Sequence, residues 1–265
     1  MAGSIRPDRR AAIDLLLYAA TLAALAFVIY RGAAAMGYGW QWYAVPVHFG
    51  RWVDGTWIWG PLPRGLLVTL QISGQALVYS ILLGLFVAIL RLIGTPVSRL
   101  LARVYLEAIR NTPMLIQLYL IYFVLAPILG IERVPAAVLA LTIFEGAYIA
   151  EIIRGGIVAV PKGQWEAARS LGLPGWVVYA RVVLPQAVRL ILPPLTGQAV
   201  SLIKHSAIVS VIAIFDLTTE GRNIIADTFM TFEIWLTVAA IYLALTGTLS
   251  ALVSLLEHKL ARPYS

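Results

Sequence analysis

Six long apolar runs dominate the sequence, and they restrict the fold more than any other feature. A helix needs about 20 apolar residues to cross the roughly 30 Å hydrocarbon layer of a membrane. Charged residues make up 12% of this 265-residue chain, whereas soluble domains carry about 25%. We therefore predict an all-α integral membrane protein and exclude soluble folds. The predicted spans are residues 11–30, 66–90, 114–129, 136–153, 194–214 and 234–256.

Residues 1–64 are predicted to form a separate N-terminal region. Its apolar run precedes a small-residue stretch at 33–35 that resembles a signal-peptide cleavage site. The run is longer than the roughly 7–15 residues of a secretory core, which favours a retained membrane anchor. Residues 31–64 are rich in tryptophan, so we expect a loop that lies on the membrane surface.

Basic residues indicate the orientation of the chain in the membrane. If the N-terminus is cytoplasmic, fourteen cations fall in inside segments and five in outside segments, with Lys204 left within a span. The positive-inside rule then places both termini in the cytoplasm. The net charge of +7 is scattered between apolar runs, which argues against a nucleic-acid partner. The inside cations are Arg6, Arg9, Arg10, Arg91, Arg99, Arg103, Arg110, Arg154, Lys162, Arg169, Arg181, Arg189, Lys259 and Arg262, and the outside ones are Arg31, Arg51, Arg64, Arg133 and Arg222.

One polar block, residues 161–186, interrupts the apolar runs on the predicted cytoplasmic side. Ala167 and Ala168 favour a helix, and Gly172 is placed to end it. Pro174 can begin a second helix over 175–183, which we expect Pro185 and the pair at 193–194 to interrupt. The block therefore predicts a helix, a turn and a second helix. Just after the second predicted span, the basic amphipathic segment 99–110 predicts a helix at the membrane interface.

The spacing of this block resembles the EAA loop of permease subunits of bacterial ABC importers. The pattern is Glu166-Ala167-Ala168, then Gly172, then residues 182–185. Flanking segments at 110–117, 146–157 and 159–164 are similar to the polar amino acid branch of that family, the histidine, glutamine and arginine permeases. The resemblance covers residues 65–260. It implies a five-helix type I importer core over 65–265, with one extra N-terminal transmembrane helix.

The resemblance also implies roles and partners. The EAA block would be a coupling helix in a groove of a cytoplasmic ATPase, with Ala167 and Ala168 allowing close approach, Glu166 and Arg169 making charged contacts, and Gly172 permitting the chain reversal. The chain contains no GxxxxGK[ST] sequence, so ATP and Mg would be bound by a partner ATPase dimer, and no enzyme activity or cofactor is expected in this chain. The other expected partners are membrane lipid, a second permease chain, identical or homologous, and a periplasmic amino-acid-binding protein that docks near the acidic loop at 216–227. The expected location is the bacterial inner membrane.

Polar residues within the spans are candidates for a substrate pathway. Lys204 lies ten residues from each end of the run 194–214, which predicts a position near the membrane midplane. Gln198, Ser201, Lys204 and His205 fall on one helical face. Ser206 and Gln117 complete the predicted pathway residues, because buried polar groups in membranes usually mark function.

Glu145 has three interpretations. It could pair with Lys204 as a static strut, bind a zwitterionic substrate together with Lys204, or be protonated without a partner. Glu151 and Arg154 are three residues apart at the end of the same run, which predicts a helical ion pair that supports a gate or the coupling block.

Two other functions are compatible with parts of the sequence. Lys204, His205, Glu145 and Glu151 could form the proton relay of a secondary amino acid transporter. An integral membrane enzyme would need a nucleophile, a paired-carboxylate site or a metal site, and the three histidines lie in separate segments with no carboxylate at ligand spacing. We therefore predict no metal and no catalytic residue.

Overall fold

The computed structural model describes residues 9–260, and it describes the side chains of residues 13–92 and 94–255. Of the cations counted above, Arg6, Arg9, Arg10, Lys259 and Arg262 have side chains outside these ranges. The chain divides into two compact units, Met1–Trp42 and Tyr43–Ser265. The second unit thus begins upstream of residue 65, where the sequence placed the start of the core.

The first unit contains one long helix, α1, Arg9–Ala35. None of its apolar window is buried within the chain. An isolated helix with apolar residues on all sides is suited to lipid rather than to water, because its surface has no other apolar partner. Near its end, the indole rings of Trp40 and Trp42 stack with centroids 6.2 Å apart.

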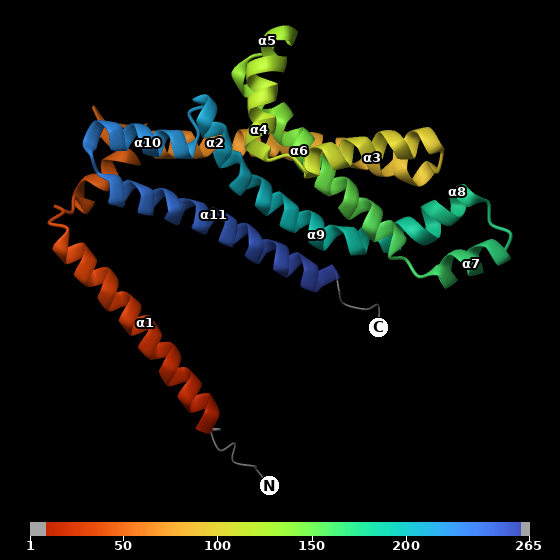
Figure 1. Cartoon of the computed structure of the whole chain (residues 1–265), viewed down its shortest axis with the longest axis horizontal. Coiled ribbons are helices and arrows are strands. Elements are labelled where there is room, and N and C mark those ends of the chain that lie inside the picture. The colour runs from red at the N-terminus through yellow and green to blue at the C-terminus, as the bar shows by residue number, and fades with distance from the viewer. Residues whose placement is uncertain (1–8, 261–265) are drawn as a thin grey trace. The chain divides into compact units, whose positions relative to one another are not determined.

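The second unit consists of helices and one small hairpin (Figure 1). Its α-helices are α2 Pro61–Ile93, α3 Pro96–Arg110, α4 Met114–Tyr119, α5 Ala126–Leu129, α6 Arg133–Val158, α7 Lys162–Ser170, α8 Gly175–Val177, α9 Leu184–His205, α10 Leu217–Thr228 and α11 Thr231–Leu260. The remaining elements are the 3-10 helices η1 Trp42–His48 and η4 Ser206–Ile212, the π-helices η2 Leu120–Leu125 and η3 Val178–Val183, and the strands β1 Gly50–Val53 and β2 Thr56–Trp59.

Small residues allow the central helices to approach closely. α2 packs along α6, and a Cβ atom added at Gly84 of α2 would lie 2.6 Å from a methyl carbon of Ile149. α6 in turn packs on α9, where a Cβ at Gly156 would lie 2.3 Å from Ile191 Cγ1. Lipid is as apolar as the side chains, so close packing of this kind supplies much of the association energy between membrane helices.

Among residues 9–260, five helices are long and apolar enough to cross a membrane. The predicted third span, 114–129, reaches this length only together with α3, and the two parts are bent by 105°. Gln117 holds the bend, because its side-chain amide donates to the carbonyls of Ile109 and Thr112 at 2.7 and 2.9 Å. Together the two parts would form a sixth, broken span.

The prolines after the polar block do not interrupt the helix, contrary to our prediction. Helical structure continues over Gly175–Ile212, so the span begins well before residue 194. The π-helical turn η3 directly precedes Pro185, and its wider hydrogen bonding accommodates a residue that lacks an amide hydrogen. Because the predicted ends of the span were wrong, they no longer place Lys204 at its centre.

The predicted acidic loop at 216–227 is instead the helix α10. Asp216 caps it, since its Oδ1 accepts a hydrogen bond from the backbone amide of Thr219 at 2.9 Å. Figure 1 shows α10 at the end of the second unit opposite to α7 and α8.

The tryptophan-rich segment is also folded. Strands β1 and β2 pair as an antiparallel hairpin, and Asp54 and Gly55 turn the chain with φ of 47° and 76°. Positive φ at both turn residues is typical of the type I′ turn that suits two-residue hairpins. Val45 of η1 packs in the same apolar cluster as Leu62 of α2, so this segment belongs to the second unit.

Candidate functional site

The first candidate site is α7 and the turn that follows it. Gly172 has a φ of +70°, which favours glycine, and the chain reverses there as predicted. Its amide donates to the carbonyl of Arg169 at 2.9 Å, and the amide of Leu173 donates to that of Ala168 at 3.3 Å. These two bonds form a Schellman motif, which satisfies carbonyls at the end of the helix.

The two alanines of this block face different surroundings. Ala168 is buried against Val178 and Val183, and the ring of Trp165 packs edge-on against Tyr179 at 5.0 Å. Ala168 therefore seats α7 on its own chain, and the predicted role of close approach to a partner falls to Ala167. Glu166, Ala167 and Arg169 are exposed.

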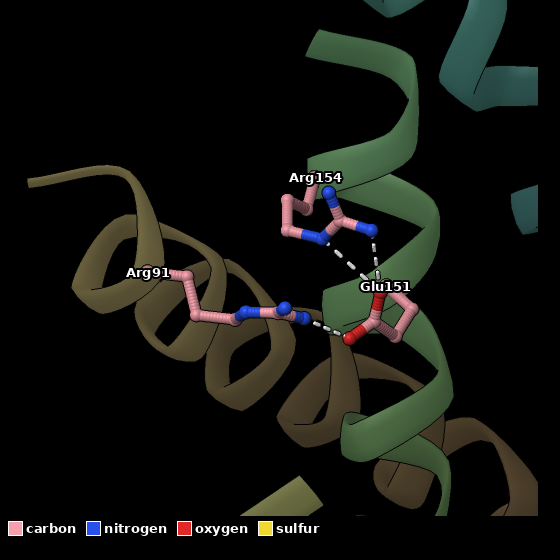
Figure 2. Close-up of polar contacts among 3 residues, drawn as sticks. All are labelled: Arg91, Glu151 and Arg154. Atoms are coloured by element: carbon pink, nitrogen blue, oxygen red, sulfur yellow. Dashed lines mark hydrogen bonds and ion pairs between the residues drawn. The ribbon is translucent and has the colours of Figure 1, made fainter. Parts of the chain in front are cut away.

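The second candidate site is a carboxylate clasped by two arginines (Figure 2). Glu151 Oε2 accepts hydrogen bonds from Arg154 Nε and Nη2 at 3.1 and 2.9 Å, which confirms the predicted pair. Glu151 Oε1 pairs with Arg91 Nη1 of α2, so the cluster also joins α2 to α6. Arg91 could not be predicted as a partner because the pairing crosses 60 residues, and the sequence shows only an arginine near the end of an apolar run.

The third candidate site is the buried Glu145, which is fully inaccessible to solvent within the chain. Its Oε1 lies 2.6 Å from His205 Nδ1, and its Oε2 accepts a hydrogen bond from Gln198 Nε2. Glu145 does not pair with Lys204, so the predicted strut has the wrong partner. Gln198 and His205 are two helical turns apart and share a face of α9, whereas Lys204 is rotated about 100° from His205.

The other predicted pathway residues do not join this cluster. Lys204 is exposed and has no ion pair within the described part of the chain, and Ser201 is half-buried. Ser206 is buried and donates to the carbonyl of Ile203 at 2.8 Å. Gln117 stabilises the bend between α3 and α4, as described above. Gln198, His205 and Glu145 are therefore the predicted pathway residues that the fold brings together, and their role in a pathway stays a prediction.

Comparison with known proteins defines the family. The family model described as "Binding-protein-dependent transport system inner membrane component" matches residues 80–262. The chain belongs to this family. The matched residues begin within α2.

Two curated relatives resemble this transport component over nearly their whole length. The glutamine transport system permease protein GlnP of Escherichia coli strain K12 is 38% identical over 213 residues, which cover 78% of this chain and 97% of GlnP. The probable glutamine ABC transporter permease protein GlnM of Bacillus subtilis strain 168 is 39% identical over 201 residues, which cover 76% and 93%.

Solved structures confirm the predicted importer permease fold. The crystal structure of an amino acid ABC transporter with histidines matches with a TM-score of 0.72 and 42% identity, covering 75% of this chain and 94% of that chain. An inward-facing MetNI methionine ABC transporter matches with a TM-score of 0.66 at 21% identity, which shows the shared fold alone. The chain is thus a multi-pass inner membrane transport component.

Proposed function

We propose that this chain is the transmembrane permease subunit of an ATP-driven importer for polar amino acids. The observation that carries the proposal is the 42% identity to an amino acid ABC transporter across nearly all of that chain, joined to the similarity to glutamine permeases. Glutamine and related polar amino acids are the proposed substrates. The ATPase activity would reside in partner subunits that bind ATP and Mg.

We infer that α7 is the element that docks on the ATPase. The exposed side chains of Glu166, Ala167 and Arg169 offer a small central residue between two charges. Burial of Ala168 and the Trp165–Tyr179 contact fix α7 to the start of the long helix that leads to Gln198 and His205. Motion imposed on α7 would therefore move α9, the helix whose side chains contact Glu145 of α6.

The proposed assembly follows from this placement of α7. With α7 and both termini in the cytoplasm, as the positive-inside rule predicts, α10 faces the periplasm and becomes the landing surface for a binding protein. Exposed apolar side chains on α4, η2 and α5, such as Leu120, Phe123 and Ile128, would meet lipid or a second permease chain, identical or homologous.

The polar cluster suggests how the pathway handles a zwitterion. Both oxygens of Glu145 are engaged, so in this conformation the carboxylate acts as a strut between α6 and α9. Lys204 precedes His205 in the chain and has no ion pair among the residues whose side chains are described, and it is the proposed contact for a substrate α-carboxylate. Glu151 and its arginines would support the helix end nearest to α7.

Reconstitution tests the function. Liposomes that contain this chain alone should accumulate no amino acid, even with a proton gradient. Liposomes with the assembled ATPase and binding protein should accumulate glutamine or another polar amino acid only when ATP is supplied. Proton-driven uptake by the chain alone would instead support the secondary transporter, an alternative that the comparisons do not favour.

A further inference from the structure

The hairpin and the start of α2 line a cavity of about 400 Å³. Arg51 of β1, Arg64 of α2 and His48 line it together with the apolar side chains of Val47, Ile58 and Trp59. All of these residues lie within the second unit and precede residue 80, where the family match begins. The cavity therefore lies outside the residues that the family model matches.

The fold holds the two arginines in place. Arg51 stands opposite Ile58 in the hairpin, so the two share one face, whereas Trp52 and Trp57 pair on the other. The amide of Gly60 donates to the carbonyl of Phe49 at 2.9 Å, and a Cβ at Gly60 would lie 2.1 Å from the carbonyl oxygen of His48. The backbone at the base of the hairpin is thus closely packed where the chain enters α2.

The two guanidinium groups differ from the other outer-side arginines of this unit. Arg133 Nη1 donates to the carbonyl of Ala213 at 2.7 Å, and Arg222 Nη2 donates to that of Ser210 at 2.8 Å. Arg51 and Arg64 are exposed and have no hydrogen bond or ion pair within residues 13–92 and 94–255. Arg64 acts on a carboxylate only at longer range: burial raises the pKa of Glu220, and the field of Arg64 partly offsets that rise.

The position of the cavity relative to the membrane indicates which anion it binds. Arg64 lies two residues before the apolar run 66–90, and α2 has only apolar or uncharged side chains from there until Arg91. The arginines therefore sit where the hydrocarbon layer meets the phosphate groups of the lipids. The exposed indoles of Trp52, Trp57 and Trp59 around them are the side chains that favour this layer.

We propose that this cavity is a binding site for the headgroup of an anionic phospholipid. Arg51 and Arg64 would hold the phosphate oxygens, and each guanidinium can donate two parallel hydrogen bonds. Trp59, Val47 and Ile58 would cover the glycerol and the first part of the acyl chains. His48 lines the same cavity, and its imidazole could donate a further hydrogen bond to the headgroup; burial alone lowers the pKa of His48. The site is independent of the substrate that the importer carries.

Quenching of Trp59 by brominated lipid tests the site. The assembled transporter is placed in nanodiscs of phosphatidylcholine with increasing phosphatidylglycerol, with one of the two brominated near the headgroup. The signal of Trp59 is the difference from a Trp59→Phe variant. We expect preferential quenching by phosphatidylglycerol, and a requirement for about thirtyfold more of it in the Arg51→Gln/Arg64→Gln variant.

Two control variants separate the effect of the site from a general loss of charge and from misfolding of the hairpin. Arg103→Gln/Arg110→Gln removes the same charge from exposed side chains of α3 and should quench like the wild type. Arg51→Lys/Arg64→Lys keeps the charge and should stay within severalfold of the wild type, which shows that the hairpin is folded. Equal quenching by both lipids, with no effect of the arginine variants, would overturn the proposal. So would displacement of the lipid by millimolar glycerol phosphate, or a loss of binding-protein affinity in the Gln variant with lipid quenching unchanged.

Discussion

Two carboxylates on α6 are held in opposite ways, although they are only six residues apart. Glu145 is fully buried and contacts an amide and an imidazole from α9. Glu151 is about a quarter exposed and contacts two guanidinium groups, from α2 and from α6 itself. Water can still reach the ion pairs at the helix end, whereas a buried pair of full charges must offset a larger desolvation cost.

The different surroundings of the two carboxylates indicate that α6 has two structural roles. The Glu151 cluster joins α6 to α2 near the C-terminal end of α6, which leads to α7. Its ion pairs are partly exposed, so water and salt weaken them. The Glu145 cluster ties α6 to α9 through a fully buried carboxylate, although the side chain of His205 is 42% exposed, and an unpaired buried carboxylate is costly. We therefore expect changes at Glu145 to have the larger effects on stability and on transport.

The largest effect is expected for Glu145→Ala. This change leaves the side chains of Gln198 and His205 without their buried partner, and removing one member of such a group typically costs about 3 kcal/mol or more. Denaturant unfolding in detergent should show that loss, and reconstituted uptake should fall with it. A loss below about 1 kcal/mol would contradict the assignment of Glu145 as the strut between α6 and α9.

Glu145→Gln sharpens the same point with a matched shape. A glutamine side chain can accept a hydrogen bond from Gln198 and can donate one to His205 Nδ1, so the free energy of unfolding should fall by about 1 kcal/mol. Uptake measured across several amino acids should then keep its selectivity. Altered selectivity with normal stability would show that this carboxylate contacts the substrate instead of serving as a strut.

A smaller effect is expected at Glu151, and it should differ between the two arginines. Arg91→Gln breaks the link between helices and should cost about 1 kcal/mol at low salt, because the pair is partly exposed. Arg154→Gln removes an i,i+3 pair within α6 and should cost about 0.3 kcal/mol. Thermal unfolding at low and high salt measures both, and equal costs would contradict the cross-helix role of Arg91.

The smallest effect concerns a third carboxylate, Asp216, one oxygen of which is buried without a hydrogen-bond partner among the described residues. Burial raises the pKa of Asp216 above its ordinary value of 3.8, despite the opposing hydrogen bonds from Thr219 and Thr218. The folded state binds the proton of Asp216 more tightly than the unfolded state does, and this tighter binding adds to the free energy of unfolding. The contribution is fully present below pH 3.8 and is lost as the pH rises through the higher pKa of the folded state.

Asp216→Asn tests this pH dependence. Asparagine caps a helix about as well as aspartate but does not titrate, so the variant should lose the part of the stability decline that occurs above pH 4. Unfolding between pH 4 and 8 makes the comparison, with the wild type as reference. Identical pH profiles would show that Asp216 does not titrate in this range.

The sequence predicted most of the membrane fold and one carboxylate contact, the pair of Glu151 and Arg154 within α6. Apolar runs located the main helices, and Gly172 and the Glu151–Arg154 pair follow from local rules. The partners of Glu145 and Arg91 depend on which helix faces align, which no local pattern specifies. The continuous helix through Pro185 was not predicted, because the π-helical turn that accommodates this proline has no clear sequence signal. The helix α10 was not predicted, because Asp216 was interpreted as part of an acidic loop and not as a helix cap.

The hairpin also escaped prediction. Asp54-Gly55 is a turn signal, but the strands on either side are only four residues long and contain three tryptophans, which are equally typical of a loop that lies on the membrane surface. Its packing on α2 depends on the close approach at Gly60, which becomes visible only in three dimensions.

Substrate-stimulated ATPase activity of the assembled transporter tests the central claim, that α7 couples this permease to its ATPase. Glu166→Lys reverses an exposed charge on α7 and should abolish the stimulation while insertion and complex yield remain normal. Glu107→Lys makes the same change at an exposed site on α3 and should retain the stimulation. Full stimulation in the Glu166→Lys variant would contradict the proposed coupling through α7.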